Sequence, residues 1–269
     1  MKIKKYFILI LSLIFINFLN LNAATTKGNI RKLSSQKAIA EINLTYKYVE
    51  NGEYTEIYDE NGNLLFKDKS YIPEPDITTS AMKVKIILKN GKKIPVTEQY
   101  FPSGKIRAIT EYNLKVKDED IEKNDIRKFY TSNKLGQNIY NSVITETYYE
   151  SGNLKSRMTD TGDKGKLEGY YENGNLITEA NLVNEKMGEL TKTYPEGIVK
   201  AYYPNGTLKS KIEFKKGLAN GTYETYYENG NIFEKTTMKN GKPDGKYEVY
   251  GPDGKLEENI FYKNGEVVK

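Results

Sequence analysis

The sequence predicts an all-β protein: an elongated antiparallel meander of stacked β-hairpin repeats that together form a single twisted sheet. Three observations favour this fold class. A short segment rich in tyrosine and glycine recurs along the chain, the 269 residues include 23 tyrosines and 22 glycines, and hydrophobic residues make up only 38% of the total. Tyrosine is enriched in strands and glycine in tight turns, and a low apolar content fits a thin sheet that is wet on one face.

The recurring segment has the form Tyr-Tyr-x-Asn-Gly-x-Leu, with variation at several of its positions. Its glycine recurs as Gly62, Gly104, Gly152, Gly174, Gly206, Gly230 and Gly254. From Gly152 onward the steps are 22, 32, 24 and 24 residues, and the step of 32 contains a degenerate copy ending at Gly197. A period in this range is typical of an array whose units stack on their neighbours.

Each unit is predicted to contain a strand, a tight turn, a second strand and a looser turn. Asn-Gly suits a two-residue hairpin turn because both residues tolerate positive φ. Residues 222–227 and 232–238 are predicted partner strands, and a weaker turn such as Asn240-Gly241 leads to the next unit. The side-chain alternation leaves open which face is buried. A single hairpin is marginally stable, so we expect the units to pair edge to edge.

Four regions are expected along the chain. Residues 1–24 combine three early lysines, an apolar run and Ala23-Ala24, which predicts a secretory signal peptide, with an uncleaved membrane anchor as the alternative. Residues 25–45 are predicted to be a short helix or a disordered lead-in. Residues 46–142 form an irregular repeat region with a charged insertion at 113–142, predicted as a loop or a short surface helix. Residues 143–269 form the regular array.

The composition excludes several classes of function. The chain has no histidine and no cysteine, which excludes histidine- and cysteine-based catalytic groups, the usual zinc sites and disulfides. Without the three lysines of the signal peptide, 38 basic and 36 acidic residues leave a net charge of +2, too small to indicate a nucleic-acid binder. We therefore expect no enzyme, no cofactor and no metal site.

The Tyr-Tyr-x-Asn-Gly-x-Leu units resemble the variant MORN repeat family, whose bacterial members include a group of YwqK-like antitoxins. The resemblance covers about residues 46–268 and is best from Tyr148 onward, although the tryptophan of the MORN unit is absent. It implies an elongated, grooved sheet of hairpins and a role in protein or membrane-lipid contact. Secreted bacterial proteins with such repeats have been associated with host-cell interaction.

These observations predict an exported protein, located in the periplasm, at the cell surface or in the medium, that presents an interaction or scaffold surface to an unidentified protein partner in envelope or host-cell contact. The alternatives are a toxin-neutralising, antitoxin-like protein and a membrane-lipid-binding protein that uses lysine-rich turns. The second tyrosine of each pair is the candidate partner-binding residue: Tyr149, Tyr171, Tyr203 and Tyr227. Cross-strand packing that holds the array together is the competing interpretation for these rings.

Overall fold

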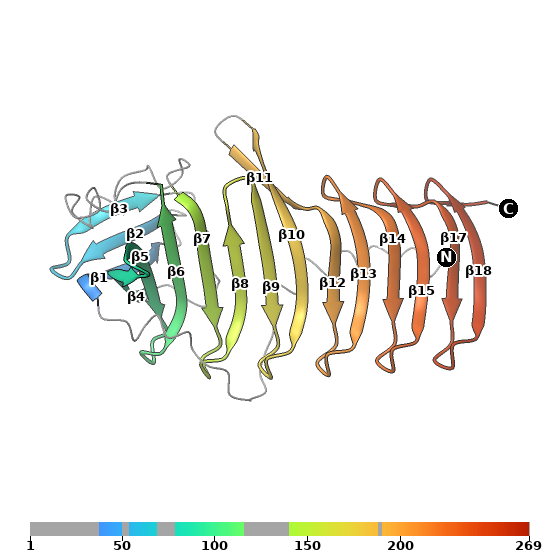
Figure 1. Ribbon diagram of the computed structural model, residues 1–269, viewed down its shortest axis with the longest axis horizontal. Helices are drawn as coiled ribbons and strands as arrows, with labels where there is room; N and C mark the ends of the chain where they lie inside the picture. The colour runs from blue at the N-terminus through green and yellow to red at the C-terminus, as the bar shows by residue number, and fades with distance from the viewer. Residues whose placement is uncertain (1–37, 50–53, 69–78, 116–139, 188–189, 269) are drawn as a thin grey trace.

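The computed structural model describes residues 38–49, 54–68, 79–115, 140–187 and 190–268. The regular structure within these ranges is nineteen β-strands of one sheet, and paired strands run antiparallel to one another. Figure 1 shows successive hairpins lying side by side in a long row, so the predicted meander of hairpin repeats is confirmed. No helix in these ranges is long and apolar enough to cross a membrane.

Six strands form the N-terminal end of the sheet, where β1 pairs on one side with β2 and on the other with β4. The order at this end is therefore β3–β2–β1–β4–β5–β6. Their bounds are β1 Ala38–Val49, β2 Tyr54–Asp59, β3 Leu64–Asp68, β4 Thr79–Lys89, β5 Lys92–Tyr100 and β6 Ile106–Leu114.

The first of these strands corrects a sequence-based expectation. Residues 38–45, predicted as part of a short helix or a disordered lead-in, lie in β1. Leu44 pairs with Asp59 of β2 and with Met82 of β4, so the backbone of β1 is bonded to a neighbour on each side. Tertiary pairing here overrides the local preference of the segment. The predicted signal peptide and the rest of the lead-in lie outside the described residues.

The remaining strands form the array. They are β7 Tyr140–Tyr148, β8 Leu154–Asp160, β9 Lys164–Tyr170, β10 Leu176–Met187, β11 Leu190–Pro195, β12 Gly197–Tyr202, β13 Leu208–Lys215, β14 Leu218–Tyr226, β15 Ile232–Lys239, β16 Lys242–Pro243, β17 Gly245–Tyr250, β18 Leu256–Lys263 and β19 Glu266–Val267. After β6 the order is β7–β8–β9–β10–β12–β13–β14–β15–β17–β18.

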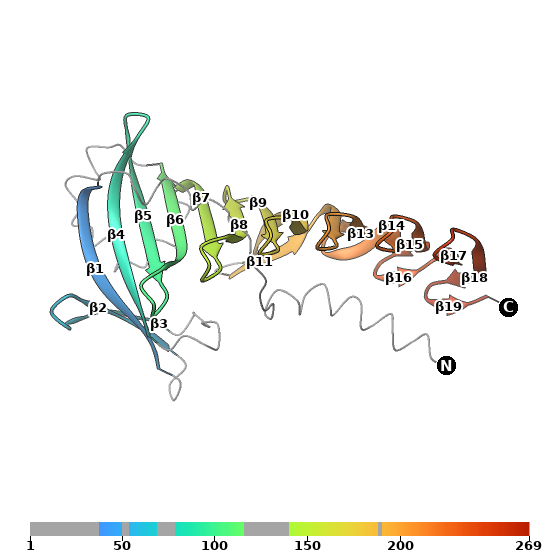
Figure 2. The ribbon, with the colours of Figure 1, turned by 90° about the horizontal axis from the view of Figure 1, so that it is seen from below.

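Three short strands, β11, β16 and β19, continue the hairpins at one edge. They pair with the far ends of β10, β15 and β18, and Figure 2 shows them turned below the main row of strands. The edge on which they lie is therefore folded out of the plane of the sheet.

The charged insertion predicted at 113–142 begins and ends in paired strand. Asn113 of β6 pairs with Ser142 of β7, and Leu114 pairs with Tyr140. Only residues 116–139 of this segment lie outside the described residues. The strands that flank the insertion are therefore direct neighbours, and the insertion does not interrupt the sheet.

The two kinds of turn differ from the prediction. The Asn-Gly turn inside each Tyr-Tyr unit is a five-residue loop: Tyr226 pairs with Ile232, the amide of Tyr227 donates to the carbonyl of Asn231, and only Gly230 has positive φ, 89°. The turn between units is the tight one, since Lys239 pairs with Lys242 and both Asn240 and Gly241 have positive φ, 51° and 79°. Positive φ at both central residues is the signature of a type I′ hairpin turn.

One face of the array carries its apolar core. A buried cluster on this face consists of Ala180, Val199, Ile212, Phe214, Ala219, Tyr223 and Met238. A second cluster lies at the junction with the N-terminal strands, on the opposite face of the sheet because Ile109 pairs with Glu146, and consists of Ile87, Ile94, Val96, Ile109 and Tyr148. The face that sequence alternation left open is therefore settled in β14 and β15: Tyr223 and Thr225 of one strand and Glu234, Thr236 and Met238 of the other are buried.

Candidate interaction face

The face opposite the core of the array carries a row of charged side chains, called here the charge ladder. Its members lie in direct register across successive strands: Glu146, Arg157, Glu168, Glu179, Lys200, Lys211, Glu224, Lys235 and Glu248. Cross-strand neighbours lie about 5 Å apart at Cβ, so opposite charges in such a row can pair.

Most charges in the ladder are neutralised by a neighbour. Arg157 contacts Glu146 at 2.8 Å and Glu168 at 3.8 Å. Further along, Lys200 lies 2.9 Å from Glu179, Lys211 lies 3.6 Å from Glu224, and Lys235 lies 3.0 Å from Glu248. Two adjacent lysines, Lys166 and Lys246, contact Glu168 and Glu248. With these two lysines the ladder has five carboxylates and six cations, so it is highly charged but nearly balanced.

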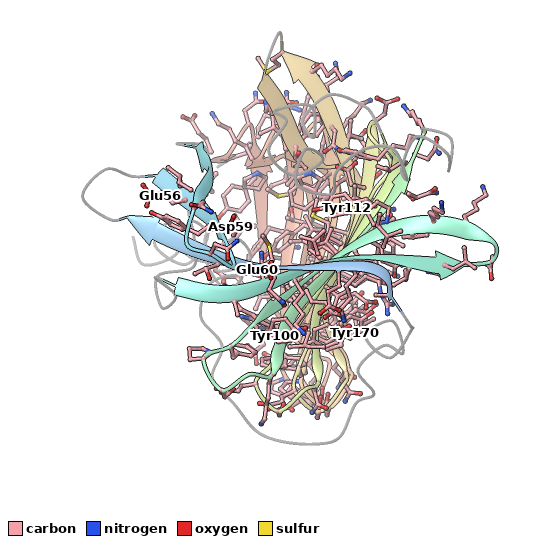
Figure 3. All side chains as sticks on the ribbon, turned by 90° about the vertical axis from the view of Figure 1, so that its left-hand side faces the viewer. Glu56, Asp59, Glu60, Tyr100, Tyr112 and Tyr170 are labelled. Atoms are coloured by element: carbon pink, nitrogen blue, oxygen red, sulfur yellow. The ribbon has the colours of Figure 1, made fainter. Side chains whose placement is uncertain are left out.

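A row of tyrosines runs beside the ladder, two residues further along every second strand. This tyrosine row consists of Tyr100, Tyr148, Tyr170, Tyr202, Tyr226 and Tyr250. Residues two apart in a strand share a face, so the row lies on the same face as the ladder. Figure 3, which looks along the molecule from its β1 end, places Tyr100 and Tyr170 close together in projection, as expected for members of one row seen end-on.

The hydroxyls of the tyrosine row point toward carboxylates of the ladder. Tyr148 donates to Glu146 at 2.8 Å, Tyr226 donates to Glu224 at 2.6 Å, and Tyr202 donates to Glu179 at 2.8 Å. Tyr100 donates in the same way to Glu98, which also pairs with Lys85 at 2.7 Å. From Tyr170 onward the rings are half-buried, whereas Tyr148 is only 2% exposed. These bonds hold the rings in fixed orientations.

The pKa values of these groups follow from the same contacts. Burial, together with the hydrogen bond to Glu224, raises the pKa of the Tyr226 phenol to about 12. Hydrogen bonds from Lys200 and Tyr202 lower the pKa of the Glu179 carboxyl. Hydrogen bonds from Lys246 and Lys235 lower the pKa of the Glu248 carboxyl to about 2. At neutral pH these tyrosines are therefore neutral donors and these two carboxylates are ionised.

The second tyrosines of the pairs, predicted as partner-binding residues, lie in the five-residue loops. Each donates its hydroxyl to the main-chain carbonyl of the first tyrosine of the next unit. The bonds run from Tyr149 to Tyr170 at 2.8 Å, Tyr171 to Tyr202 at 3.0 Å, Tyr203 to Tyr226 at 2.8 Å and Tyr227 to Tyr250 at 2.9 Å. These four residues, called here the loop tyrosines, connect consecutive units. Their rings are half-buried.

Asparagines of the same loops add further connections between units. Asn173 and Asn175 both donate to the carbonyl of Pro204 at 2.8 Å. Asn229 and Asn231 both donate to the carbonyl of Pro252, at 2.9 Å and 2.8 Å. The loop edge of the array is therefore joined by side-chain bonds as well as by the strand ladder.

The core face holds a buried carboxylate that the sequence did not indicate. Glu234 is 5% exposed and accepts hydrogen bonds from Tyr223, at 2.9 Å, and from Tyr247. Each of these tyrosines is less than one-tenth exposed. No group of three or more acidic side chains that could hold a metal ion occurs among the described residues. Because two phenols donate to it, Glu234 is a buried polar group with hydrogen-bond partners in the core.

A scan against protein families matches the MORN repeat variant in five segments, residues 143–159, 164–184, 195–216, 219–240 and 243–264. The regular array thus contains five segments that match this repeat. The matched segments lie between β7 and β18, leave out most of β11, and include the four loop tyrosines. No curated protein matches the sequence.

Two recurring features of these units escaped sequence reasoning. The first is the Glu-x-Tyr pattern that places a carboxylate and a tyrosine on one face, as in Glu146-Thr147-Tyr148 and Glu224-Thr225-Tyr226. The second is a glycine five residues before the first tyrosine. Gly221 and Gly245 there have φ of 119° and 138°; Gly221 lies at a register shift between β13 and β14, and Gly245 begins β17 after the break that follows β16. Both signals recur in the sequence and could have been found by aligning the units beyond the turn.

Proposed function

We propose that this protein is an exported scaffold that binds a protein partner through the charge ladder and tyrosine row of its MORN array. The observation that carries the proposal is the continuity of this face. The register is kept from β7 to β17 although the sequence spacing of the units varies, and from β8 to β17 the ladder side chains are partly exposed, which supports an extended binding surface made of repeated parts. Tyrosine offers large contact area at low entropic cost, which suits such a surface.

Export is part of the same proposal and rests on the first 24 residues. Their basic start, apolar run and small residues fit a secretory signal peptide. Cell fractionation tests this directly. We expect the protein in the periplasm, at the cell surface or in the medium, and recovery of the protein from the cytoplasm would contradict export.

A pull-down tests the scaffold function. The full chain would be immobilised and exposed to envelope and host-cell extracts, in parallel with the double variant Tyr202→Ala/Tyr226→Ala. We expect a discrete protein partner that the native chain retains and the double variant loses. A toxin among the retained proteins would make the scaffold an antitoxin-like neutraliser. Equal retention by both chains would show that this face is not the binding surface.

The alternative is membrane-lipid binding, in which lysines at the tight turns would contact anionic lipid head groups. Along this edge, however, Asp244 lies 3.1 Å from Lys263 and 3.9 Å from Lys239. An acidic residue among the lysines weakens attraction to anionic lipid. Flotation with anionic vesicles decides the matter: salt-sensitive co-flotation would favour lipid, and its absence would leave the protein partner.

A further inference from the structure

We infer that the partner of this face is an uncharged, proline-rich segment in the polyproline II conformation, lying across the strands along the tyrosine row. The inference rests on the proposed function and names the chemistry of the partner. Three observations lead to it: the spacing of the tyrosines, the fixed orientation of their rings and the balance of the neighbouring charges.

The spacing comes from the sheet. Members of the tyrosine row lie on every second strand, for example Tyr202 on β12, Tyr226 on β14 and Tyr250 on β17, with β13 and β15 between them. Neighbouring strands lie about 4.8 Å apart, so consecutive rings of the row recur at about 9.6 Å. This interval is the same for each unit, whatever the length of the loops.

Few polypeptide conformations repeat at that interval. A polyproline II helix rises about 3.1 Å per residue with three residues per turn, so equivalent side chains recur at about 9.3 Å. A β-strand presents one face every 6.6 Å or so, and two turns of an α-helix span about 10.8 Å. The repeat of a polyproline II helix therefore matches the spacing of the tyrosine row over several units. The repeats of the other two conformations differ from that spacing after one unit.

The rings of the tyrosine row are preorganised for binding such a ligand. Proline-rich segments dock on aromatic-lined surfaces, since the rigid polyproline II helix loses little entropy on binding. Tyr202 and Tyr226 are held by their hydrogen bonds to Glu179 and Glu224, so these rings need little reordering when a ligand binds. Phe233, 38% exposed and 5.0 Å from the ring of Tyr227, adds apolar surface between Tyr226 and Tyr250.

The charges favour an uncharged occupant. Because the carboxylates and cations of the ladder pair with one another, a charged partner would have to break those pairs to gain from them. The lysines nevertheless keep spare donors: Lys200 and Lys235 side chains are each 40% exposed. A polyproline II backbone has no internal hydrogen bonds, so its carbonyls are free to accept from these ammonium groups. The surface is thus complementary to a neutral chain rich in carbonyls.

The test measures binding of fluorescent oligoproline peptides of 6, 9 and 12 residues to the full-length protein by anisotropy. We expect affinity to rise several-fold with each added set of three prolines, with little dependence on salt. A Gly-Ser peptide of 12 residues should bind at least tenfold more weakly than the oligoproline of equal length. Absence of oligoproline binding, or equal binding of the Gly-Ser peptide, would overturn the inference.

Variants locate the site. Tyr202→Ala and Tyr226→Ala should each weaken binding about tenfold, and Tyr226→Phe, which keeps the ring, should remain within about twofold of the native chain. Tyr194→Ala, on β11 and outside the row, is the matched control and should bind as the native chain does. Circular dichroism would confirm that each variant is folded. Unchanged binding by the two folded row variants would contradict the assignment.

Two further outcomes separate this inference from the proposed function. If oligoproline fails to bind but Tyr202→Ala/Tyr226→Ala still loses the partner found by pull-down, the scaffold function stands and the proline chemistry is wrong. A β-1,4-linked amino-sugar hexamer, tested in the same assay, provides the other outcome. Binding of the sugar in place of oligoproline would assign the row to a glycan and overturn the inference.

Discussion

The hydroxyl of Tyr203 donates a hydrogen bond to the main-chain carbonyl of Tyr226, 2.8 Å away in the next unit. The same bond recurs in each of the three other loop tyrosines, and it ends at Tyr250, whose following residue is Gly251. One side chain per unit thus reaches across the loop edge and fixes the distance to its neighbour. In an array stabilised by contacts between nearest neighbours, such a bond acts on the interface and not on the single hairpin.

Tyr203→Phe should therefore destabilise the array by about 1 kcal/mol, because it leaves the carbonyl of Tyr226 without this donor while keeping the ring. Chemical denaturation would measure the change. Hydrogen exchange should locate it in β12 to β15, on both sides of the altered bond. Tyr262→Phe is the control, since no hydrogen bond from the Tyr262 hydroxyl is found in the described structure. An equal loss in both variants would mean that the inter-unit bond has no special role.

Substitutions at two glycines separate backbone strain from contact between units. Gly174 and Gly217 both have positive φ, 89° and 76°, so alanine should cost about 1 kcal/mol at either position. A Cβ at Gly174 would have open space, whereas a Cβ at Gly217 would lie 2.9 Å from the Cβ of Tyr194 in the preceding unit.

We accordingly expect Gly217→Ala to lower the free energy of unfolding more than Gly174→Ala does. Thermal and urea denaturation of the two variants, measured side by side, would give the difference. If the two changes were equal, the tight turn would not pack against its neighbour as closely as described.

The ion pair between buried Glu146 and partly exposed Arg157 predicts a measurable coupling. Glu146 is 1% exposed, so Arg157→Met, which removes its 2.8 Å cation partner, should destabilise the protein by about 2 kcal/mol. The double variant Glu146→Gln/Arg157→Met should lose less than the sum of the single changes, with a coupling of about 1 kcal/mol or more. Urea unfolding of the four proteins gives the cycle, and purely additive effects would argue against the pair.

Stability at low pH should depend on Glu248. Its pKa is lowered from 4.5 to about 2 by Lys246 and Lys235, so its contribution to stability is present above about pH 4.5 and is lost as the pH falls toward 2. The stability difference between the native chain and Glu248→Gln should therefore shrink over this range. Lys246→Met should raise the pKa and shift the loss to higher pH. A difference that stays constant from pH 7 to pH 2 would contradict this account.

Much of the fold was predictable from the repeats. Alternation around Tyr223 and the Tyr-Tyr-x-Asn-Gly segments predicted hairpins in a meander; residues 232–238 closely match β15, and residues 222–227 match the second part of β14, which begins four residues earlier. The turn types were reversed because Asn-Gly is compatible with both. What decides between them is the number of residues between the last paired positions, five between Tyr226 and Ile232 and two between Lys239 and Lys242.

The candidate face was harder to predict, since it depends on register between strands. Glu179 and Lys200 are 21 residues apart in sequence and directly opposed in the sheet, because β10 pairs with β12 in its first half and with β11 in its second. The local sequence pattern does not show that the hairpin of β10 and β11 extends beyond its neighbours, nor which residues of β10 then pair with β12. The loop tyrosines were identified from the sequence, whereas their bonds to the next unit depend on the spacing between hairpins.

The central claim, that the face with the charge ladder and tyrosine row contacts a protein, is tested most directly by photo-cross-linking in cells that produce the protein. A photoreactive residue would replace Ile198, 44% exposed on that face, or Leu218, 51% exposed beside the tight turn between units. The account predicts a discrete protein adduct from position 198 that is absent at 218 and lost in the Tyr202→Ala/Tyr226→Ala background. Adducts at position 218 alone, or a lipid adduct in place of a protein at 198, would contradict it.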